Sequence, residues 1–197
     1  VVDEAWMEDV ANRFVANLEQ EFDAAKGFRV NKADWFEGDW SGFTAPREAI
    51  TERRAAATGV SRERLDEVAN VITTPPANFS IHKTLARILD AKKTMLETGE
   101  GIDWATAEAL AFGTLLQDGY GVRLSGQDSG RGTFSQRHAA WIDQKDGHKY
   151  IPLSTIDRRF QVLDSPLSEF GVLGFEYGYA SAAPNTLVLW EAQFGDF

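Results

Sequence analysis

Hydrophobic residues recur at helical spacing through the first half of the chain. Across residues 3–26 an apolar side chain falls at every fourth position, which predicts an amphipathic helix that packs its apolar stripe on a neighbour. The stripe consists of Trp6, Val10, Phe14, Leu18 and Phe22. Further helices are predicted over residues 46–58, 61–72 and 82–98, and Ser61 is a good N-cap for the second of these.

The second half has a different pattern, in which short strand-like runs are separated by helices. The strands are predicted at residues 122–125, 160–163 and 186–190. A helix capped by Asp103 precedes the first strand, and a helix over residues 165–182 joins the last two. Strand, helix and strand joined by short turns form a βαβ unit with parallel strands. The expected fold class is α/β, with a helical connector over residues 1–100 and a parallel-sheet domain over residues 101–197.

The helix predicted over residues 165–182 has two notable features. Ser165 is a suitable N-cap and Pro166 suits the first helical position, which places Glu169 in or just past the first turn. The helix also has three glycines on one face, each costing about 1 kcal/mol relative to alanine. These glycines are Gly171, Gly174 and Gly178. Their shared face predicts the close approach of another backbone, from the same domain or from a second subunit.

Composition excludes several classes of protein. The 197 residues include 20 Lys and Arg and 30 Asp and Glu, for a formal net charge of −10, so the chain lacks the basic footprint that nucleic acid requires. No apolar run approaches the ~20 residues of a membrane span. The chain has no cysteine, which excludes disulfides, zinc–thiolate sites and thiol nucleophiles.

The two ends of the chain predict that it is an internal piece of a longer enzyme. Val1 is not an initiator methionine, and Phe197 comes directly after a predicted strand. An α/β domain normally continues from such a strand into a helix.

Several motifs carry a resemblance to a known family. They lie at residues 31–35, 101–113, 123–138, 167–171, 174–179 and 190–197. Together they resemble the pyrimidine-binding domain of thiamine diphosphate enzymes. More narrowly, they resemble the thiamine-dependent decarboxylating component of the 2-oxoglutarate dehydrogenase complex. The resemblance covers most of the chain and is strongest from Gly101 to the end, which implies a transketolase-like pyrimidine-binding domain over residues 101–197.

This resemblance implies an activity and its partners. The enzyme would decarboxylate 2-oxoglutarate oxidatively in the tricarboxylic acid cycle and pass a succinyl group to the lipoyl arm of the succinyltransferase component. It would use thiamine diphosphate and magnesium, form a homodimer, and work in the cytoplasm, or in the mitochondrial matrix if eukaryotic. One alternative is a related thiamine-dependent 2-oxo acid decarboxylase or carboligase. The other is a non-catalytic domain that only mediates dimerisation.

The resemblance also assigns roles to particular residues. Glu169 would hydrogen-bond a ring nitrogen of the cofactor's aminopyrimidine and favour its imino form, as the catalytic residue. The other cofactor-binding residues would be Leu167, Phe194, Phe197, Gln127 and Asp128. Glu176 lies seven residues after Glu169, on nearly the same helix face, and is a rival carboxylate. His82 and His138 are interpreted as structural.

Some parts of the family pattern are absent. The chain has no Gly-Asp-Gly element followed by an Asn pair, the pattern that holds magnesium and the diphosphate in this superfamily. The magnesium ligands are therefore expected outside this chain, and the chain alone is expected to be inactive. Phe170 also replaces the second acid that many family members have after the glutamate, so the identity of the substrate depends on the other motifs.

Overall fold

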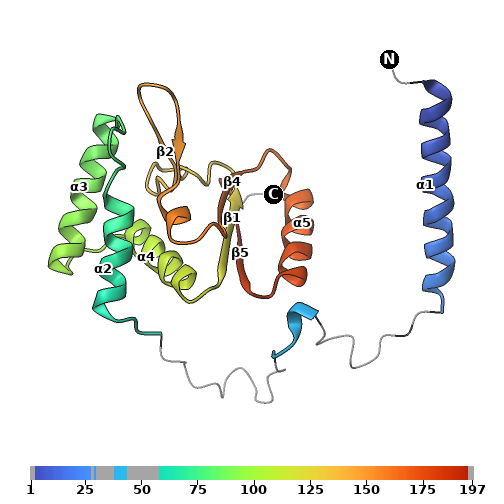
Figure 1. Cartoon of the computed structure of the whole chain (residues 1–197), viewed down its shortest axis with the longest axis horizontal. Coiled ribbons are helices and arrows are strands. Elements are labelled where there is room, and N and C mark those ends of the chain that lie inside the picture. Colours follow the sequence, from blue (N-terminus) through green and yellow to red (C-terminus); the bar gives the residue numbers. More distant parts are fainter. Residues whose placement is uncertain (1–2, 28, 30–37, 44–57, 195–197) are drawn as a thin grey trace. The chain divides into compact units, whose positions relative to one another are not determined.

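The computed structural model describes residues 3–27, 29, 38–43 and 58–194. Residues 46–57 of the helix predicted over residues 46–58 lie outside the described residues, as does Phe197. The chain divides into two compact units, residues 1–45 and 46–197 (Figure 1). This division into compact units does not test the predicted domain boundary near residue 100, which stays a prediction.

The first unit is built around helix α1, Glu4–Ala25. The Asp3 side chain caps this helix by accepting a hydrogen bond from the backbone N–H of Ala5, and a short 3₁₀ helix, η1, follows at Gly38–Trp40. The predicted helix is thus confirmed. No residue of α1 is buried in the structure, so its apolar stripe is exposed.

Three helices open the second unit. They are α2 (Arg62–Thr73), α3 (Lys83–Thr98) and α4 (Trp104–Gln117). The Asp103 carboxylate caps α4 by accepting from the N–H of Thr106 at 2.7 Å. His82 caps α3 in the same way, since its Nδ1 accepts from the N–H of Thr84 at 3.2 Å. The imidazole of His82 therefore has a structural role.

A glycine allows α2 and α4 to pack closely. A Cβ at Gly113 would lie 2.3 Å from Cγ1 of the fully buried Val68, so only glycine fits between the two helices. The core continues from this contact to the sheet. It contains Val68, Ile72, Phe112, Leu116, Val122, Leu124, Leu153, Phe160 and Val162.

The sheet has three parallel strands in the order β4-β1-β5. The strands are β1 (Gly121–Gly126), β4 (Phe160–Asp164) and β5 (Thr186–Glu191). The parallel β4–α5–β5 unit was predicted from the sequence and is confirmed. However, β1 lies between β4 and β5, so the connection through α5 spans the central strand. A separate small antiparallel pair, β2 (Trp141–Ile142) and β3 (Lys149–Tyr150), and the 3₁₀ helix η3 (Pro152–Thr155) lie between β1 and β4 in the sequence.

Helices α4 and α5 lie on opposite sides of this sheet (Figure 1). On the α4 side, Val122 and Leu124 of the central strand point into the apolar core. On the α5 side, Arg123 and Ser125 hydrogen-bond Glu176 of α5. The sheet therefore has an apolar face and a face with buried polar groups.

Helix α5 runs from Glu169 to Ala182, with Ser168 at the N-cap. The prediction that Ser165 is the N-cap and that the helix begins at Pro166 was wrong by three residues. The N–H of Ser165 donates to the carbonyl of Gly126 at 2.7 Å, and the N–H of Leu167 donates to Oγ of Ser165. These bonds close a turn against the end of β1, and Glu169 becomes the first residue of the helix.

The glycine face of α5 has no partner in the described residues. A Cβ added at Gly174 or Gly178 would have no atom within 4 Å, and at Gly171 it would meet only Oγ of Ser168 at 3.6 Å. The close backbone approach expected from these glycines is therefore not made within the described part of this chain. A second subunit as the partner stays a prediction. Among the described residues, no helix is long and apolar enough to cross a membrane.

Candidate functional site

The carboxyl ends of the three parallel strands bring the predicted site residues to one edge of the sheet. Gln127 directly follows β1, Glu169 begins the helix after β4, and Phe194 comes three residues after β5. In open α/β sheets, ligands bind at this edge. The site is therefore assembled from segments that lie far apart in the sequence.

Gln127 and Glu169 are joined by a direct hydrogen bond. Nε2 of Gln127 donates to Oε1 of Glu169 at 2.9 Å, while Oε1 of Gln127 accepts from the backbone N–H of Gln193 at 3.0 Å. The two partners fix the orientation of the amide, because an N–H can only donate and a carboxylate can only accept. No described residue donates to the second oxygen of Glu169, Oε2.

The loop after β1 is fixed to both neighbouring strands. The N–H of Gly130 donates to Oδ1 of Asp164 at the end of β4, at 2.9 Å. The N–H of Gln127 donates to the carbonyl oxygen of Glu191 at the end of β5, at 3.1 Å. A Cβ at Gly126 would lie 2.1 Å from that same carbonyl oxygen, so glycine is required where the two strand ends meet.

The remaining predicted contacts lie around this edge. Asp128 is on the same loop, with a positive φ of 66°, but its carboxylate pairs with Arg131 rather than with Glu169. Leu167, two residues before Glu169, is 51% exposed, and Phe194, which follows β5, is 77% exposed, so both present apolar surface. Phe197 lies outside the described residues. The roles of these residues in cofactor binding stay predictions.

Glu176 has a different environment from Glu169. Glu176 is only 5% exposed. Its carboxylate forms a two-pronged ion pair with Arg123, at 2.7 and 2.9 Å, and accepts a hydrogen bond from Oγ of Ser125 at 2.7 Å. Burial opposes the ionisation of Glu176, but the hydrogen bonds from Arg123 and Ser125 outweigh it and hold the pKa below its usual range. The Arg123 guanidinium also lies 5.4 and 4.6 Å from the ring centres of Phe175 and Tyr179. Both oxygens of Glu176 are thus engaged in holding α5 on β1.

A second buried cluster of charged side chains was not predicted from the sequence. Arg137 is 7% exposed and donates to Glu108 of α4 at 2.6 Å, to Glu191 at the end of β5 at 2.8 Å, and to the carbonyl of Ser129 at 3.0 Å. Burial opposes the charge of Arg137, but the hydrogen bonds that Arg137 donates to the two carboxylates outweigh it and raise the pKa of the guanidinium. This cluster ties the loop after β1 to the helix and strand beside it.

Two titratable groups near Arg137 line a small cavity of about 30 Å³. Burial lowers the pKa of both Lys92 and His138. Nζ of Lys92 donates to the carbonyl of Arg137 at 3.3 Å, and the backbone of His138 has a positive φ of 49°. The interpretation of His138 as structural stays a prediction.

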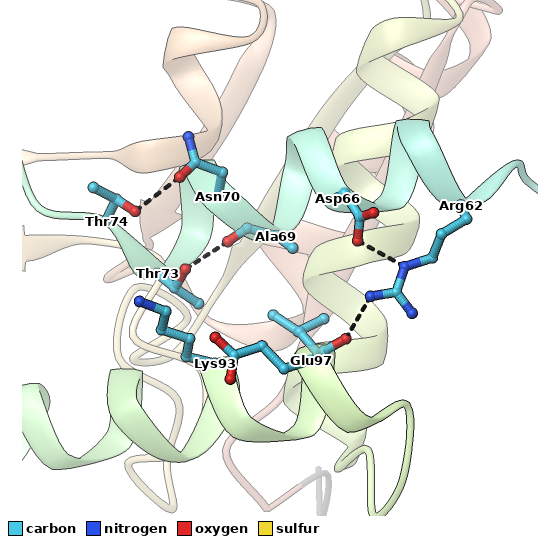
Figure 2. Close-up of a pocket in the computed structure, with 9 residues that line it drawn as sticks. Arg62, Asp66, Ala69, Asn70, Thr73, Thr74, Lys93 and Glu97 are labelled. Atoms are coloured by element: carbon cyan, nitrogen blue, oxygen red, sulfur yellow. Dashed lines mark hydrogen bonds and ion pairs between the residues drawn. The ribbon is translucent and has the colours of Figure 1, made fainter.

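A larger hollow of about 160 Å³ lies between α2 and α3 (Figure 2). Its polar groups mostly bond one another: Arg62 donates to Asp66 at 2.7 Å and to the carbonyl of Leu96 at 2.9 Å. None of the predicted site residues lines it. The hollow is therefore separate from the edge of the sheet.

The donor set at the sheet edge suits an aminopyrimidine ring. An oriented carboxylate with one oxygen that no described residue occupies can bond a ring nitrogen, and exposed apolar side chains can cover a flat ring. In contrast, the described residues contain no group of three His, Asp or Glu side chains that could hold a metal ion. The binding of the pyrimidine end of thiamine diphosphate at this edge, and the location of the magnesium ligands outside this chain, stay predictions.

The fold and this edge agree with the comparison to known families. Residues 100–197 match the family described as transketolase, pyrimidine binding domain, so this part of the chain belongs to that family. This confirms the predicted α/β fold class, with a helical region followed by a parallel sheet.

The comparison with whole proteins is more specific. The chain is 50% identical over 184 residues to the 2-oxoglutarate dehydrogenase E1 component of Brucella anthropi. The matched region covers 92% of this chain and 18% of that protein. The chain is 49% identical over 183 residues to the protein of the same name from Brucella ovis, covering 91% of this chain and 18% of the relative. The resemblance to this thiamine-dependent component is thus confirmed, and the chain spans 18% of the length of these relatives.

Proposed function

We propose that this chain is a segment of a thiamine diphosphate-dependent 2-oxoglutarate dehydrogenase and supplies the pyrimidine side of its cofactor site. The observation that carries the proposal is the Glu169 carboxylate. It lies at the carboxyl ends of the strands and is held through one oxygen by Gln127, and its other oxygen accepts no hydrogen bond from the described residues. Glu176 is a poorer candidate, because Arg123 and Ser125 occupy its carboxylate.

When bound, thiamine diphosphate supplies the nucleophile that attacks the carbonyl carbon of a 2-oxo acid. In this proposal Glu169 hydrogen-bonds a pyrimidine ring nitrogen and stabilises a proton there, which favours the imino form of the ring. Leu167, Phe194 and Phe197 cover the ring and exclude water. Gln127 and Asp128, on the loop after β1, belong to the same cofactor site.

The complete enzyme extends beyond the residues of this chain. The proposal includes magnesium ligands outside this chain, a homodimer, and transfer of a succinyl group to the lipoyl arm of a succinyltransferase component. It also includes a cytoplasmic location. The names of the relatives favour 2-oxoglutarate over other 2-oxo acids, and turnover of 2-oxoglutarate and pyruvate by the purified full-length protein distinguishes these substrates.

The central test is Glu169→Gln in the full-length protein. The amide cannot stabilise the proton on the ring nitrogen as a carboxylate does, so kcat should fall about 10²- to 10⁴-fold, the range for proton-transfer groups. Glu97→Gln is the matched control, because Glu97 is exposed on α3 and far in the chain from the site. This control should keep full activity. A Glu169→Gln protein with the kcat of the wild type would refute the proposal.

A further inference from the structure

We propose that Gln127 is a positioning residue that orients the Glu169 carboxylate and leaves one of its oxygens for the pyrimidine nitrogen. The inference rests on the proposed function of Glu169. It assigns to Gln127 an action through Glu169, rather than a contact with the cofactor.

Gln127 is itself held on two sides. Its backbone N–H donates to the carbonyl of Glu191, and its side-chain oxygen accepts from the N–H of Gln193. Both partners belong to the segment in which β5 ends. The side chain therefore cannot turn away from Glu169 without losing a hydrogen bond to the backbone.

Within the part of the chain that the structure describes, no second side chain hydrogen-bonds the Glu169 carboxylate. Glu169 is the first residue of α5, where the chain has just left a turn, and the Gln127 amide is its one side-chain partner among the described residues. A glutamate side chain has three rotatable bonds and loses considerable freedom when it is fixed. An anchored amide that donates to one oxygen removes that freedom before the ligand binds.

The chemistry of the amide suits this role. Its NH₂ group donates to Oε1, while the other end of the amide is occupied by Gln193. A neutral donor leaves the negative charge of Glu169 in place, whereas an ammonium group at the same point would offset it. Oε2 accepts nothing from the described residues and is left for the ring nitrogen.

The test measures two ligands against the wild type and each variant of the full-length protein. Calorimetry gives the affinity for thiamine diphosphate and for an analogue in which the pyrimidine nitrogen bonded by Glu169 is replaced by C–H. The wild type should prefer thiamine diphosphate by about 10- to 100-fold, as expected for a hydrogen bond to a charged group. In Gln127→Leu the preference should fall to about threefold or less, since Glu169 is no longer oriented.

Two further variants make the result specific. Gln127→Asn keeps the amide but is too short to reach both partners, so it should lose the preference as Gln127→Leu does. Gln136→Leu is the matched control, because Gln136 holds the same loop through the N–H of Phe134 and has no contact with Glu169. It should keep the preference of the wild type.

The outcomes separate the two proposals. A preference in Gln127→Leu and Gln127→Asn equal to that of the wild type would overturn the role of Gln127 and leave that of Glu169 intact. Equal affinity of the wild-type protein for both ligands would overturn the role of Glu169 and with it that of Gln127.

Discussion

The Arg123–Glu176 ion pair should be a main anchor of α5 on the sheet. The two side chains are 12% and 6% exposed, and three hydrogen bonds converge on the Glu176 carboxylate. Removing one partner of a buried ion pair leaves an uncompensated charge and costs about 3–5 kcal/mol. Glu176→Gln should therefore destabilise the contact between α5 and β1 by about 3 kcal/mol.

Hydrogen exchange in the full-length protein measures this effect locally. Because each 1.4 kcal/mol changes an equilibrium about tenfold, peptides from α5 and β1 should exchange on the order of 100-fold faster in Glu176→Gln. The double variant Arg123→Met/Glu176→Leu should exchange more slowly than Glu176→Gln, because it removes both charges and refills the space with apolar groups.

A surface ion pair provides the control. Arg13 and Asp9 of α1 have side chains that are 68% and 64% exposed, and such pairs contribute at most about 1 kcal/mol. Arg13→Met should therefore change exchange in α1 only severalfold. If Glu176→Gln also changed the exchange of α5 less than threefold, the structural reasoning about the buried pair would be wrong.

The same pair predicts a dependence on pH. Since the folded-state pKa of Glu176 is depressed below the ordinary glutamate value of 4.5, its contribution to stability is complete above that value. It is lost as the pH falls through the folded-state pKa. Protection of α5 should therefore decrease in acid below about pH 4.5, and this decrease should be smaller in the double variant.

Two glycines provide the remaining predictions. Gly113→Ala forces a Cβ to within 2.3 Å of Val68, and the resulting overpacking should cost about 1–3 kcal/mol, measured as faster exchange of α2 and α4 and relieved by adding Val68→Ala. Gly174→Leu has no clash in the described chain and should not weaken α5 itself. If this face meets a second subunit in the proposed homodimer, sedimentation should show weaker dimerisation of Gly174→Leu, with loss of activity. An intact, active dimer would exclude that position of the interface.

The candidate site was only partly accessible from the sequence. Glu169, Gln127 and Phe194 were proposed from motif resemblance, and the structure places them at one edge of the sheet. The sequence could not show that Gln127 bonds Glu169, because they are 42 positions apart and meet only when β1 and β4 pair. The Arg137 cluster was missed for a similar reason, since its partners come from α4 and β5.

One missed feature did leave a signal in the sequence. Arg123 and Ser125 alternate with Val122 and Leu124 in a strand that the βαβ pattern predicts to be covered on both faces. Polar residues at alternate positions of such a strand require buried partners. The sequence therefore indicated a polar cluster on one face, and tertiary packing identified Glu176 as its carboxylate.

Local patterns determined most of the secondary structure. The helical periodicity, the capping residues Ser61 and Asp103, and the strand runs depend on neighbours within a few positions, so they can be read from the sequence. The start of α5 could not, because the turn after β4 is set by the bond between Ser165 and the carbonyl of Gly126 in another strand. Tertiary structure likewise placed β1 between β4 and β5, since strand order depends on backbone pairing between strands that are far apart in the sequence. The sequence determined which residues are available for the site, and long-range backbone pairing decided which of them meet.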